Sequence, residues 1–344
     1  MAYHFRNLVF EGGGVKGVAY VGALESLGRR RILPAIRRVG GTSAGAINAA
    51  LFALGYSNPE TRELLRGLDF RSFLDGDWGV VRDTRRLLTR YGWYRGDAFH
   101  DWIATRVADK LGDRRATFSH LRAADRPDLY IYGANLNTGF GEIYSVEHTP
   151  GMQIADAVRI SMSIPLYFAA MRNARDEVQV DGGVLSNYPV KLFDRLHYID
   201  PEDWPLAVRR TDYYERDNAD RRRGSPYVYN RQTLGLRVDA KTVINAFRDG
   251  VQPAARRIDD FFDYARALVG TALAAQENQH LHSDDWQRTL YIDSRGVGTL
   301  DFDIDQAGVD ALLESGRAGA REYFRWFNDA ATDPVNECPE PGDD

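Results

Sequence analysis

Two glycine-rich turns near the N-terminus constrain the fold more than any other feature of the sequence. The first turn, Glu11–Gly17, follows the apolar run Leu8–Phe10 and precedes a helical pattern of small residues. The second, Gly40–Gly45, follows a short predicted strand at 37–39 and precedes an alanine-rich segment. A strand, a glycine turn and a helix, repeated so soon, predict parallel strands joined by right-handed crossovers. Sheets of this kind bind ligands at the carboxyl ends of their strands. We therefore expect both turns to open on one crevice of an α/β domain.

The rest of the chain predicts a single domain over residues 5–328, with helical insertions. Further strands are expected at 129–136, 142–146, 177–180, 234–238 and 290–292. Outside the sheet we expect a cap or insertion at about 57–121, a charged mobile loop at about 200–230, a helical segment at about 241–280 and a disordered tail at 329–344.

Composition excludes several classes of protein. The chain has 344 residues, of which 44% are hydrophobic, and this is enough for a large core. A formal net charge of -5 argues against nucleic-acid binding. The single cysteine, Cys338, cannot form an intramolecular disulfide or a cysteine-based metal cage, and we expect neither a metal nor a cofactor.

The N-terminus lacks the apolar segment of a cleavable signal peptide. The longest small and apolar run, 44–55, is shorter than the roughly 20 residues that a membrane-spanning helix needs. We therefore expect a cytoplasmic protein that is at most peripheral on membranes, and export by a route without a cleavable signal stays open.

The first glycine turn is ambiguous by itself. Gly12, Gly14 and Gly17 match the G-x-G-x-x-G fingerprint of dinucleotide-binding proteins. That fold also requires an acidic residue after the next strand, where this chain has Arg37 and Arg38. A dinucleotide-binding oxidoreductase that uses only the first turn stays an alternative.

The second turn indicates catalysis. Gly41-Thr42-Ser43-Ala44-Gly45 matches G-x-S-x-G, the nucleophile elbow, in which small neighbours permit a sharp turn that presents the serine hydroxyl. Attack on an ester creates an oxyanion that needs fixed hydrogen-bond donors. The backbone N–H groups of Gly13, Gly14 and Ala44 are suited to that role.

The general base has two kinds of candidate. The usual order of a serine triad would use His197, His280 or His282, in an esterase or thioesterase, but each lies in a helix-like or polar, Asp-rich setting. Asp181 instead ends a predicted strand and precedes Gly182 and Gly183. A buried carboxylate of raised pKa can serve as the base directly.

Three blocks of sequence, taken in order, resemble the signature blocks of the patatin-like phospholipases. They are Glu11–Gly17, Gly41–Gly45 and Asp181–Gly183, and the segments Ser161–Pro165 and Val184–Val190 resemble lesser blocks. The resemblance covers about residues 5–327. Lys16 departs from it, because many members carry arginine there.

The resemblance implies a layered α/β fold, with a central, mostly parallel sheet flanked by helices. It also implies a lipid acyl hydrolase, of phospholipase A or lysophospholipase type, with Ser43 as nucleophile, Asp181 as base and no catalytic histidine. The oxyanion loop would contain Gly12, Gly13 and Gly14. The supporting motif residues would be Lys16, Gly17, Gly41, Gly45, Gly182 and Gly183.

The expected partner is a phospholipid or another lipid ester at a membrane surface. The arginines at 29–31 and 37–38 are candidates for contact with anionic headgroups, although a solvated arginine face explains them better. A helix with Phe261, Phe262 and Tyr264 is a candidate lid, although a core face explains it better. A non-catalytic lipid-sensing module stays open as an alternative.

Overall fold

The computed structural model describes residues 3–76, 80–239 and 283–338, together with 257–260, 263–264, 267–268 and 270–271. Most of the predicted helical segment 241–280 lies outside these residues. So do the candidate bases His280 and His282 and the lid candidates Phe261 and Phe262.

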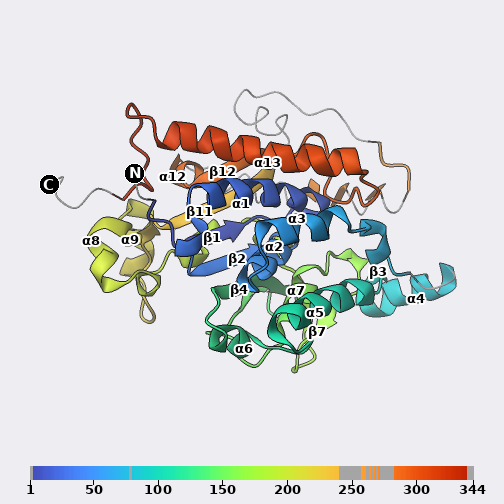
Figure 1. The fold of residues 1–344 in the computed structure, drawn as a ribbon. Coiled ribbons are helices and arrows are strands. Elements are labelled where there is room, and N and C mark those ends of the chain that lie inside the picture. Colours follow the sequence, from blue (N-terminus) through green and yellow to red (C-terminus); the bar gives the residue numbers. More distant parts are fainter. Residues whose placement is uncertain are drawn as a thin grey trace.

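A mixed, mostly parallel sheet forms the centre of the molecule (Figure 1). Its strand order is β12-β11-β1-β2-β4-β8-β7, and β5 also pairs with β4. The five strands from β12 to β4 are parallel, whereas β5 and β8 run antiparallel to β4. The strands are β1 (Asn7–Phe10), β2 (Arg38–Thr42), β4 (Asp128–Asn135), β5 (Phe140–Tyr144), β7 (Met171–Arg172), β8 (Val178–Asp181), β11 (Thr233–Asp239) and β12 (Thr289–Asp293).

The two faces of the sheet are covered differently. Successive strand residues point to opposite faces, so Leu8 and Phe10 join the main core while Val9 joins a separate cluster with Tyr130. An irregular segment at 188–198 completes that second cluster. The main core is built with the helices α1 (Ala19–Arg29), α2 (Ala44–Ala53), α7 (Ile154–Ser161) and α13 (Gln306–Phe327).

The expected insertion at 57–121 is helical, with one short strand that its sequence pattern did not predict. Strand β3 (Gly92–Tyr94) pairs in parallel with β6 (Leu166–Phe168) in a two-stranded ribbon outside the central sheet. The helices are α3 (Asn58–Arg66), α4 (Val80–Arg90), α5 (Asp97–Leu111) and α6 (Phe118–Ala123).

The segment 200–230, expected to be a mobile loop, has regular structure. It contains α8 (Trp204–Ala207) and α9 (Asp212–Ala219), and β9 (Val208–Arg209) pairs with β10 (Tyr229–Asn230). Buried tyrosines without helical or strand periodicity hold it in place; Tyr214, for example, donates a hydrogen bond to the buried Asp194.

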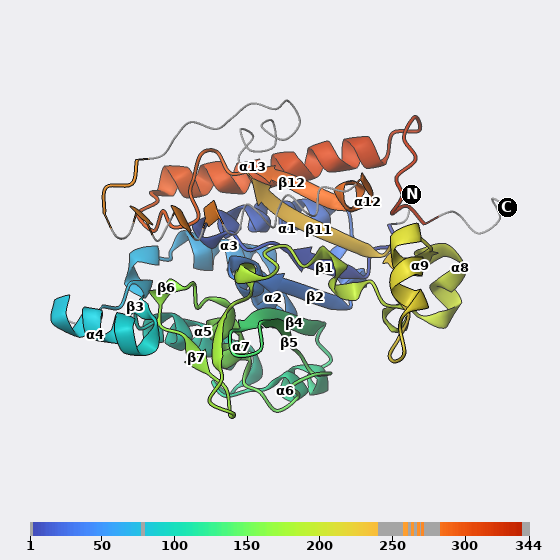
Figure 2. The same cartoon turned by 180° about the vertical axis from the view of Figure 1, so that it is seen from behind.

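This unit lies at the amino ends of the parallel strands, where Gln232, just before β11, donates to Asp203 at 2.8 Å. Figure 2 shows α8 and α9 at one end of the molecule and α4 at the other. The charged segment is therefore remote from the carboxyl ends of the strands, where the predicted site opens.

Residues 329–338, expected to be disordered, pack against the domain. The Asn336 amide donates to the Tyr323 hydroxyl at 2.9 Å, and Cys338 is buried with Ile199, Ala207 and Val228. Within the described residues, no helix is both long and apolar enough to cross a membrane.

Candidate active site

Ser43 occupies a strained turn between β2 and α2. Its φ of 54° and ψ of -127° are unusual for a residue with a side chain, and such a conformation costs about 1–3 kcal/mol. Two glycines make the turn possible. A Cβ at Gly45 would lie 2.4 Å from the Phe10 carbonyl oxygen, and a Cβ at Gly41 would lie 2.5 Å from the Gly45 carbonyl. The predicted nucleophile elbow is therefore present in its geometry.

Asp181 reaches Ser43 because two strands meet end to end along one edge of β4. Thr42, the last residue of β2, is opposite Tyr132, and Asp181, the last residue of β8, is opposite the next residue, Gly133. We expected Asp181 at a strand end that reaches the crevice. It does lie at the end of a strand, and β8 runs antiparallel to β4, so that it enters the sheet from beyond the carboxyl end of β2.

The Asp181 carboxyl group is buried, with 4% of the residue exposed. Burial raises its pKa to about 7, while hydrogen bonds from the Gly183 N–H and from the Ser43 side chain act in the opposite direction. The Gly183 N–H donates to Asp181 Oδ1 at 2.8 Å, and the Asp181 N–H donates to the Ser163 carbonyl at 3.0 Å. A carboxylate that titrates near neutral pH is suited to act as a general base.

Ser43 is also buried and is fixed from two sides. Its N–H donates to Ser161 Oγ at 2.9 Å, and that hydroxyl donates to the Tyr132 carbonyl at 2.7 Å. Its own Oγ lies 3.6 Å from Met162 Sδ. A thioether is a weak acceptor, so this contact competes little with proton transfer to a carboxylate.

The first glycine turn lies directly against the elbow, where a Cβ at Gly12 would be 3.1 Å from the Ser43 Cβ. The Gly12 N–H donates to the Asn187 carbonyl at 2.9 Å, and the Asn187 amide donates to the Gly12 carbonyl at 3.0 Å. The Gly12 N–H is thus already engaged and is a poor oxyanion donor. Within the described chain, the N–H groups of Gly13, Gly14 and Ala44 donate to no protein acceptor.

Buried charges anchor the glycine turn to β11. Glu11 Oε2 accepts the Val238 N–H at 3.0 Å, and Glu11 Oε1 lies 3.3 Å from the Arg237 guanidinium. Lys16 Nζ donates to the Val238 carbonyl at 3.3 Å. Lys16 therefore holds the turn in place. Gly14, at a φ of 55°, lies so close to the Thr299 carbonyl that a Cβ there would be 1.8 Å from the oxygen.

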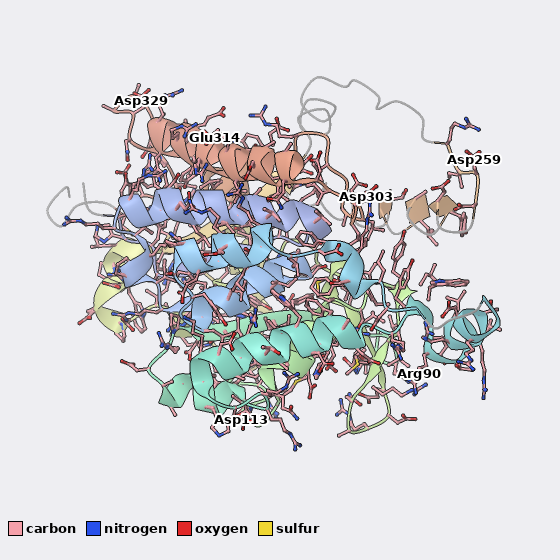
Figure 3. The ribbon with its side chains drawn as sticks, turned by 45° about the vertical axis from the view of Figure 1, so that its right-hand side comes forward. Arg90, Asp113, Asp259, Asp303, Glu314 and Asp329 are labelled. Atoms are coloured by element: carbon pink, nitrogen blue, oxygen red, sulfur yellow. The ribbon has the colours of Figure 1, made fainter. Side chains whose placement is uncertain are left out.

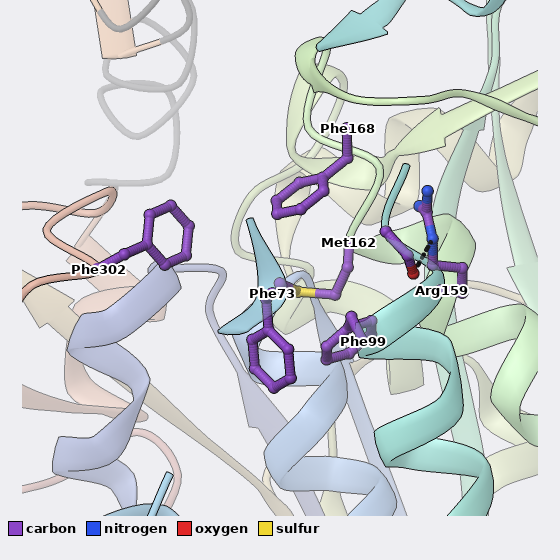
Figure 4. Close-up of a pocket in the computed structure, with 7 residues that line it drawn as sticks. Phe73, Phe99, Arg159, Met162, Phe168 and Phe302 are labelled. Atoms are coloured by element: carbon purple, nitrogen blue, oxygen red, sulfur yellow. Dashed lines mark hydrogen bonds between the residues drawn. The ribbon is translucent and has the colours of Figure 1, made fainter. Parts of the chain in front are cut away.

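A small apolar pocket lies beside Met162. Because Met162 both lines the pocket and contacts Ser43 Oγ, the pocket adjoins the elbow. Figure 4 shows the aromatic rings around it, which come from separate segments of the chain. The lining residues are Phe73, Gly96, Phe99, Arg159, Met162, Phe168 and Phe302.

Arg159 is the one charged residue of this lining, and its guanidinium is bound to backbone carbonyls. It donates to Gly96 at 2.9 Å, to Ala169 at 2.9 Å and to Arg95 at 2.5 Å, and also to Ser163 Oγ at 2.6 Å. Burial lowers its pKa to about 10. Arg159 thus ties β3, α5 and β6 to the segment that carries Ser161, Met162 and Ser163.

None of the histidines in the described chain hydrogen-bonds Ser43 or Asp181. The candidate His197 is exposed beside Tyr198, whose carbonyl accepts a bond from Arg38 at the opposite end of β2 from Ser43. His100, His120 and His148 bond Asp156, Thr117 and Ser145 respectively. The described residues also contain no group of three or more His, Cys, Asp or Glu side chains placed to hold a metal ion.

The arginines at 29–31 and 37–38 lie at the amino ends of the strands, on the side opposite Ser43. Arg37 pairs with Asp200, Arg38 donates to the Tyr198 carbonyl, and Arg30 lies over the Phe324 ring. These contacts agree with a surface role that is unrelated to the crevice.

Several site residues were not singled out from the sequence. Ser161, Met162 and Ser163 belong to a segment that was noticed only through its resemblance to a lesser family block. Phe73, Phe168 and Phe302 carry no local signal, because only the fold brings their three segments together.

The family model described as patatin-like phospholipase matches residues 8–194. The uncharacterised protein YqhO of Bacillus subtilis is 30% identical over 338 residues, covering 92% of this chain and 97% of its own. The probable lipid hydrolase 463L of invertebrate iridescent virus 6 is 26% identical over 208 residues, covering 60% of this chain and 70% of its own.

Among solved structures, VipD of Legionella pneumophila has the same fold, with a TM-score of 0.61 at 17% identity. The match covers 94% of this chain and 67% of VipD. With the family model spanning more than half of the chain and YqhO aligned over nearly its whole length, this chain belongs to the patatin-like phospholipases, a family of lipid acyl hydrolases.

Proposed function

We propose that the protein is a serine hydrolase that cleaves carboxylic esters of phospholipids, with Ser43 as the nucleophile and Asp181 as the general base. One observation carries the proposal. A strained, buried serine adjoins a buried carboxyl group whose pKa is raised to about 7, beside an apolar pocket. In the first step Asp181 accepts the Ser43 proton while Oγ bonds to the ester carbonyl carbon.

The negative charge that forms on the carbonyl oxygen needs fixed donors. The N–H groups of Gly13, Gly14 and Ala44 are unengaged within the described chain and are the donors we propose. Gly12 has a structural role instead, since its hydrogen bonds with Asn187 fix the turn. Removal of one such donor in serine hydrolases costs about 2.7–4 kcal/mol of transition-state stabilisation.

When the tetrahedral intermediate collapses, the bond to the lyso-lipid oxygen breaks, and the Asp181 carboxyl group returns its proton to that oxygen. A water molecule then attacks the acyl-enzyme, with Asp181 again accepting the proton. Ser43 leaves with a proton from Asp181, and a fatty acid is released. No histidine or metal is needed in this sequence of steps.

The apolar pocket is the proposed site of the acyl chain. Its lining is aromatic and its charged member, Arg159, is bound to backbone carbonyls. Burial of each methylene contributes about 0.8 kcal/mol. The apolar lining therefore favours a fatty acyl group over a polar one, as in a phospholipase A or lysophospholipase reaction.

Labelling with a fluorophosphonate ester tests the proposal. The wild type is expected to be labelled at Ser43, and Ser43→Ala is expected to show no labelling. Asp181→Asn is expected to be labelled much more slowly, and His197→Ala at the wild-type rate. A folded wild type that stays unlabelled, while a control serine esterase reacts, would favour a non-catalytic lipid-sensing module.

Mass spectrometry of products from a defined phospholipid gives the second readout. A free fatty acid with the matching lyso-lipid, absent with Ser43→Ala, is the expected result. Release of the headgroup instead would contradict cleavage of a carboxylic ester. Loss of activity in a folded His197→Ala variant would instead indicate a serine triad with His197 as the base.

A further inference from the structure

Helix α4 stands at the periphery of the molecule and is fastened by a polar contact. Figure 3 labels Arg90, at the end of α4 that joins the rest of the protein. On the inner side of the helix, the buried Arg86 donates to the buried Asp83 at 2.8 Å and also to the Trp93 carbonyl. The inner face is thus held by an ion pair and a backbone bond.

The exposed surface of α4 combines unpaired positive charge with exposed apolar side chains. Arg82, Arg85 and Arg90 are exposed and make no ion pair within the described chain. Leu88 is 73% exposed, and Tyr91, just after the helix, is 47% exposed. The only acidic residue between positions 82 and 91 is the buried Asp83, so this stretch exposes no carboxylate.

The arrangement of these side chains suits an interface between water and lipid. Residues three or four apart lie side by side on a helix, so Leu88 adjoins Arg85 on the side of α4 away from Arg86. Arg82 and Arg90, each four residues from Arg86, flank the inner side. An amphipathic helix of this kind can bury its apolar side chains at the headgroup boundary while arginines contact anionic headgroups. A neutral surface would leave the arginines without anionic partners. An acidic protein surface without apolar side chains would leave Leu88 and Tyr91 in water.

The fold links α4 to the wall of the apolar pocket. Strand β3 follows α4 and pairs with β6, with Tyr94 opposite Phe168, whose ring lines the pocket. The Ala170 N–H, just after β6, donates to the Arg90 carbonyl at 2.9 Å. Figure 1 shows α4 and β3 at the end of the molecule away from α8 and α9. A membrane that binds α4 therefore lies close to the wall of the apolar pocket.

We propose that α4 docks the protein on an anionic lipid surface, through the exposed Arg82, Arg85 and Arg90 and the apolar Leu88 and Tyr91. This inference rests on the proposed function, because it takes lipid esters to be the substrate. The favoured occupant is a membrane with acidic headgroups, since Leu88 beside Arg85, flanked by Arg82 and Arg90, matches both the apolar and the anionic part of such a surface. An acidic protein and a second copy of this chain are the competing occupants.

The test is co-sedimentation of the full chain with vesicles of phosphatidylcholine, with and without phosphatidylserine. All variants carry Ser43→Ala, so that no hydrolysis changes the vesicles during the measurement. Replacement of the three α4 arginines by alanine is expected to weaken binding to the anionic vesicles about fivefold per arginine, or ~100-fold together. Leu88→Gln, which keeps the charge, is expected to weaken it roughly tenfold.

A matched control removes the same positive charge elsewhere, by replacing the exposed Arg31, Arg115 and Arg325 with alanine. This control is expected to bind almost like the parent, and circular dichroism checks that every variant is folded. Binding by the parent is also expected to weaken as salt rises, because salt screens exposed charges.

Several outcomes would overturn the proposal. These are equal loss in the control and α4 variants, equal binding to neutral and anionic vesicles, and no vesicle binding at all. Self-association that the α4 variant abolishes, without vesicle binding, would assign the face to a second copy. The hydrolase proposal is judged separately by labelling of Ser43. If the protein binds anionic vesicles through α4 but Ser43 is not labelled, the docking proposal stands and the hydrolase proposal is contradicted.

Discussion

The Ser161 hydroxyl bridges the strained Ser43 and the central sheet, accepting the Ser43 N–H at 2.9 Å and donating to the Tyr132 carbonyl at 2.7 Å. Ser161 is fully buried, so no solvent replaces these bonds if the hydroxyl is lost. The elbow therefore depends on a side chain from α7 as well as on its own glycines.

Ser161→Ala is expected to lower kcat more than it raises KM, because it leaves the backbone N–H of Ser43, the proposed nucleophile, unsatisfied and the turn less well fixed. The expected loss of stability is about 1–3 kcal/mol, the cost of leaving a buried polar group without a partner. Steady-state kinetics on a soluble ester and a denaturant melt measure the two effects. The exposed Ser119→Ala is the control. An unchanged kcat in Ser161→Ala would remove the positioning role.

Activity is expected to rise with pH through a midpoint near 7. Burial raises the pKa of Asp181 to about 7, and only the deprotonated carboxylate can accept the Ser43 proton. The pH dependence of kcat/KM for a soluble ester, whose own charge does not change, measures this midpoint. A profile that is flat between pH 5 and 9 would show that Asp181 is not the base that limits the reaction.

Asp181→Asn is expected to abolish activity and to stabilise the fold at alkaline pH. The folded-state pKa of about 7 exceeds the ordinary value of 3.8, so the folded protein holds the proton more tightly than the unfolded chain does. Stability therefore falls as the pH rises from about 4 to about 7, by at most about 4 kcal/mol. Asparagine cannot ionise, and it retains an oxygen that can accept the Gly183 N–H.

Thermal melts at pH 5 and pH 8 measure this difference. The variant is expected to melt well above the wild type at pH 8, with a smaller gap at pH 5. A wild type that is at least as stable as Asp181→Asn at both pH values would contradict a buried carboxylate with a raised pKa.

How far the sequence predicts the site depends on whether a residue's role is set locally. The elbow was predictable, because its sharp turn requires glycine at positions 41 and 45 in the sequence itself. The position of Asp181 was predictable only by resemblance, since nothing local reveals that β8 runs antiparallel and meets β2 end to end. The partner of the Gly12 N–H, the Asn187 carbonyl, is equally a product of the fold.

The segment 200–230 shows why aperiodic sequence was misread as mobile. Its order comes from single tyrosines that reach buried charges, such as Tyr214 with Asp194, and such contacts leave no periodic pattern. The order at Asn336 likewise depends on a side-chain contact, with Tyr323 in the preceding helix α13. Long-range polar contacts of this kind become visible only in the folded chain.

Phe302→Ala is expected to reduce turnover of long-chain esters selectively. Phe302 lines the proposed acyl pocket, and a long acyl chain has more apolar surface to lose than an acetyl group when this ring is removed. The expected loss in kcat/KM is roughly tenfold for a long-chain ester and small for an acetyl ester, since burying a phenylalanine-sized surface contributes about 1.5–3 kcal/mol. The 74% exposed Phe140→Ala is the control. Equal losses on both esters would place the acyl chain elsewhere.

Arg159→Lys is expected to destabilise the protein and to impair catalysis although the charge is kept. The guanidinium binds three carbonyl groups and Ser163 Oγ at once, and a lysine ammonium has three donors and a different shape. The Ser163 carbonyl in turn accepts the Asp181 N–H, so the loss is transmitted to the proposed general base. Stability is expected to fall by about 2–4 kcal/mol, through buried carbonyls left without donors.

Catalysis by the folded fraction of Arg159→Lys separates positioning from stability. We expect the midpoint of its pH profile to move from that of the wild type, because the surroundings of Asp181 relax. The exposed Arg175→Lys, which retains its pairing with Glu177, is the matched control. A variant with lower stability but an unchanged kcat and an unchanged pH midpoint would limit Arg159 to a structural role.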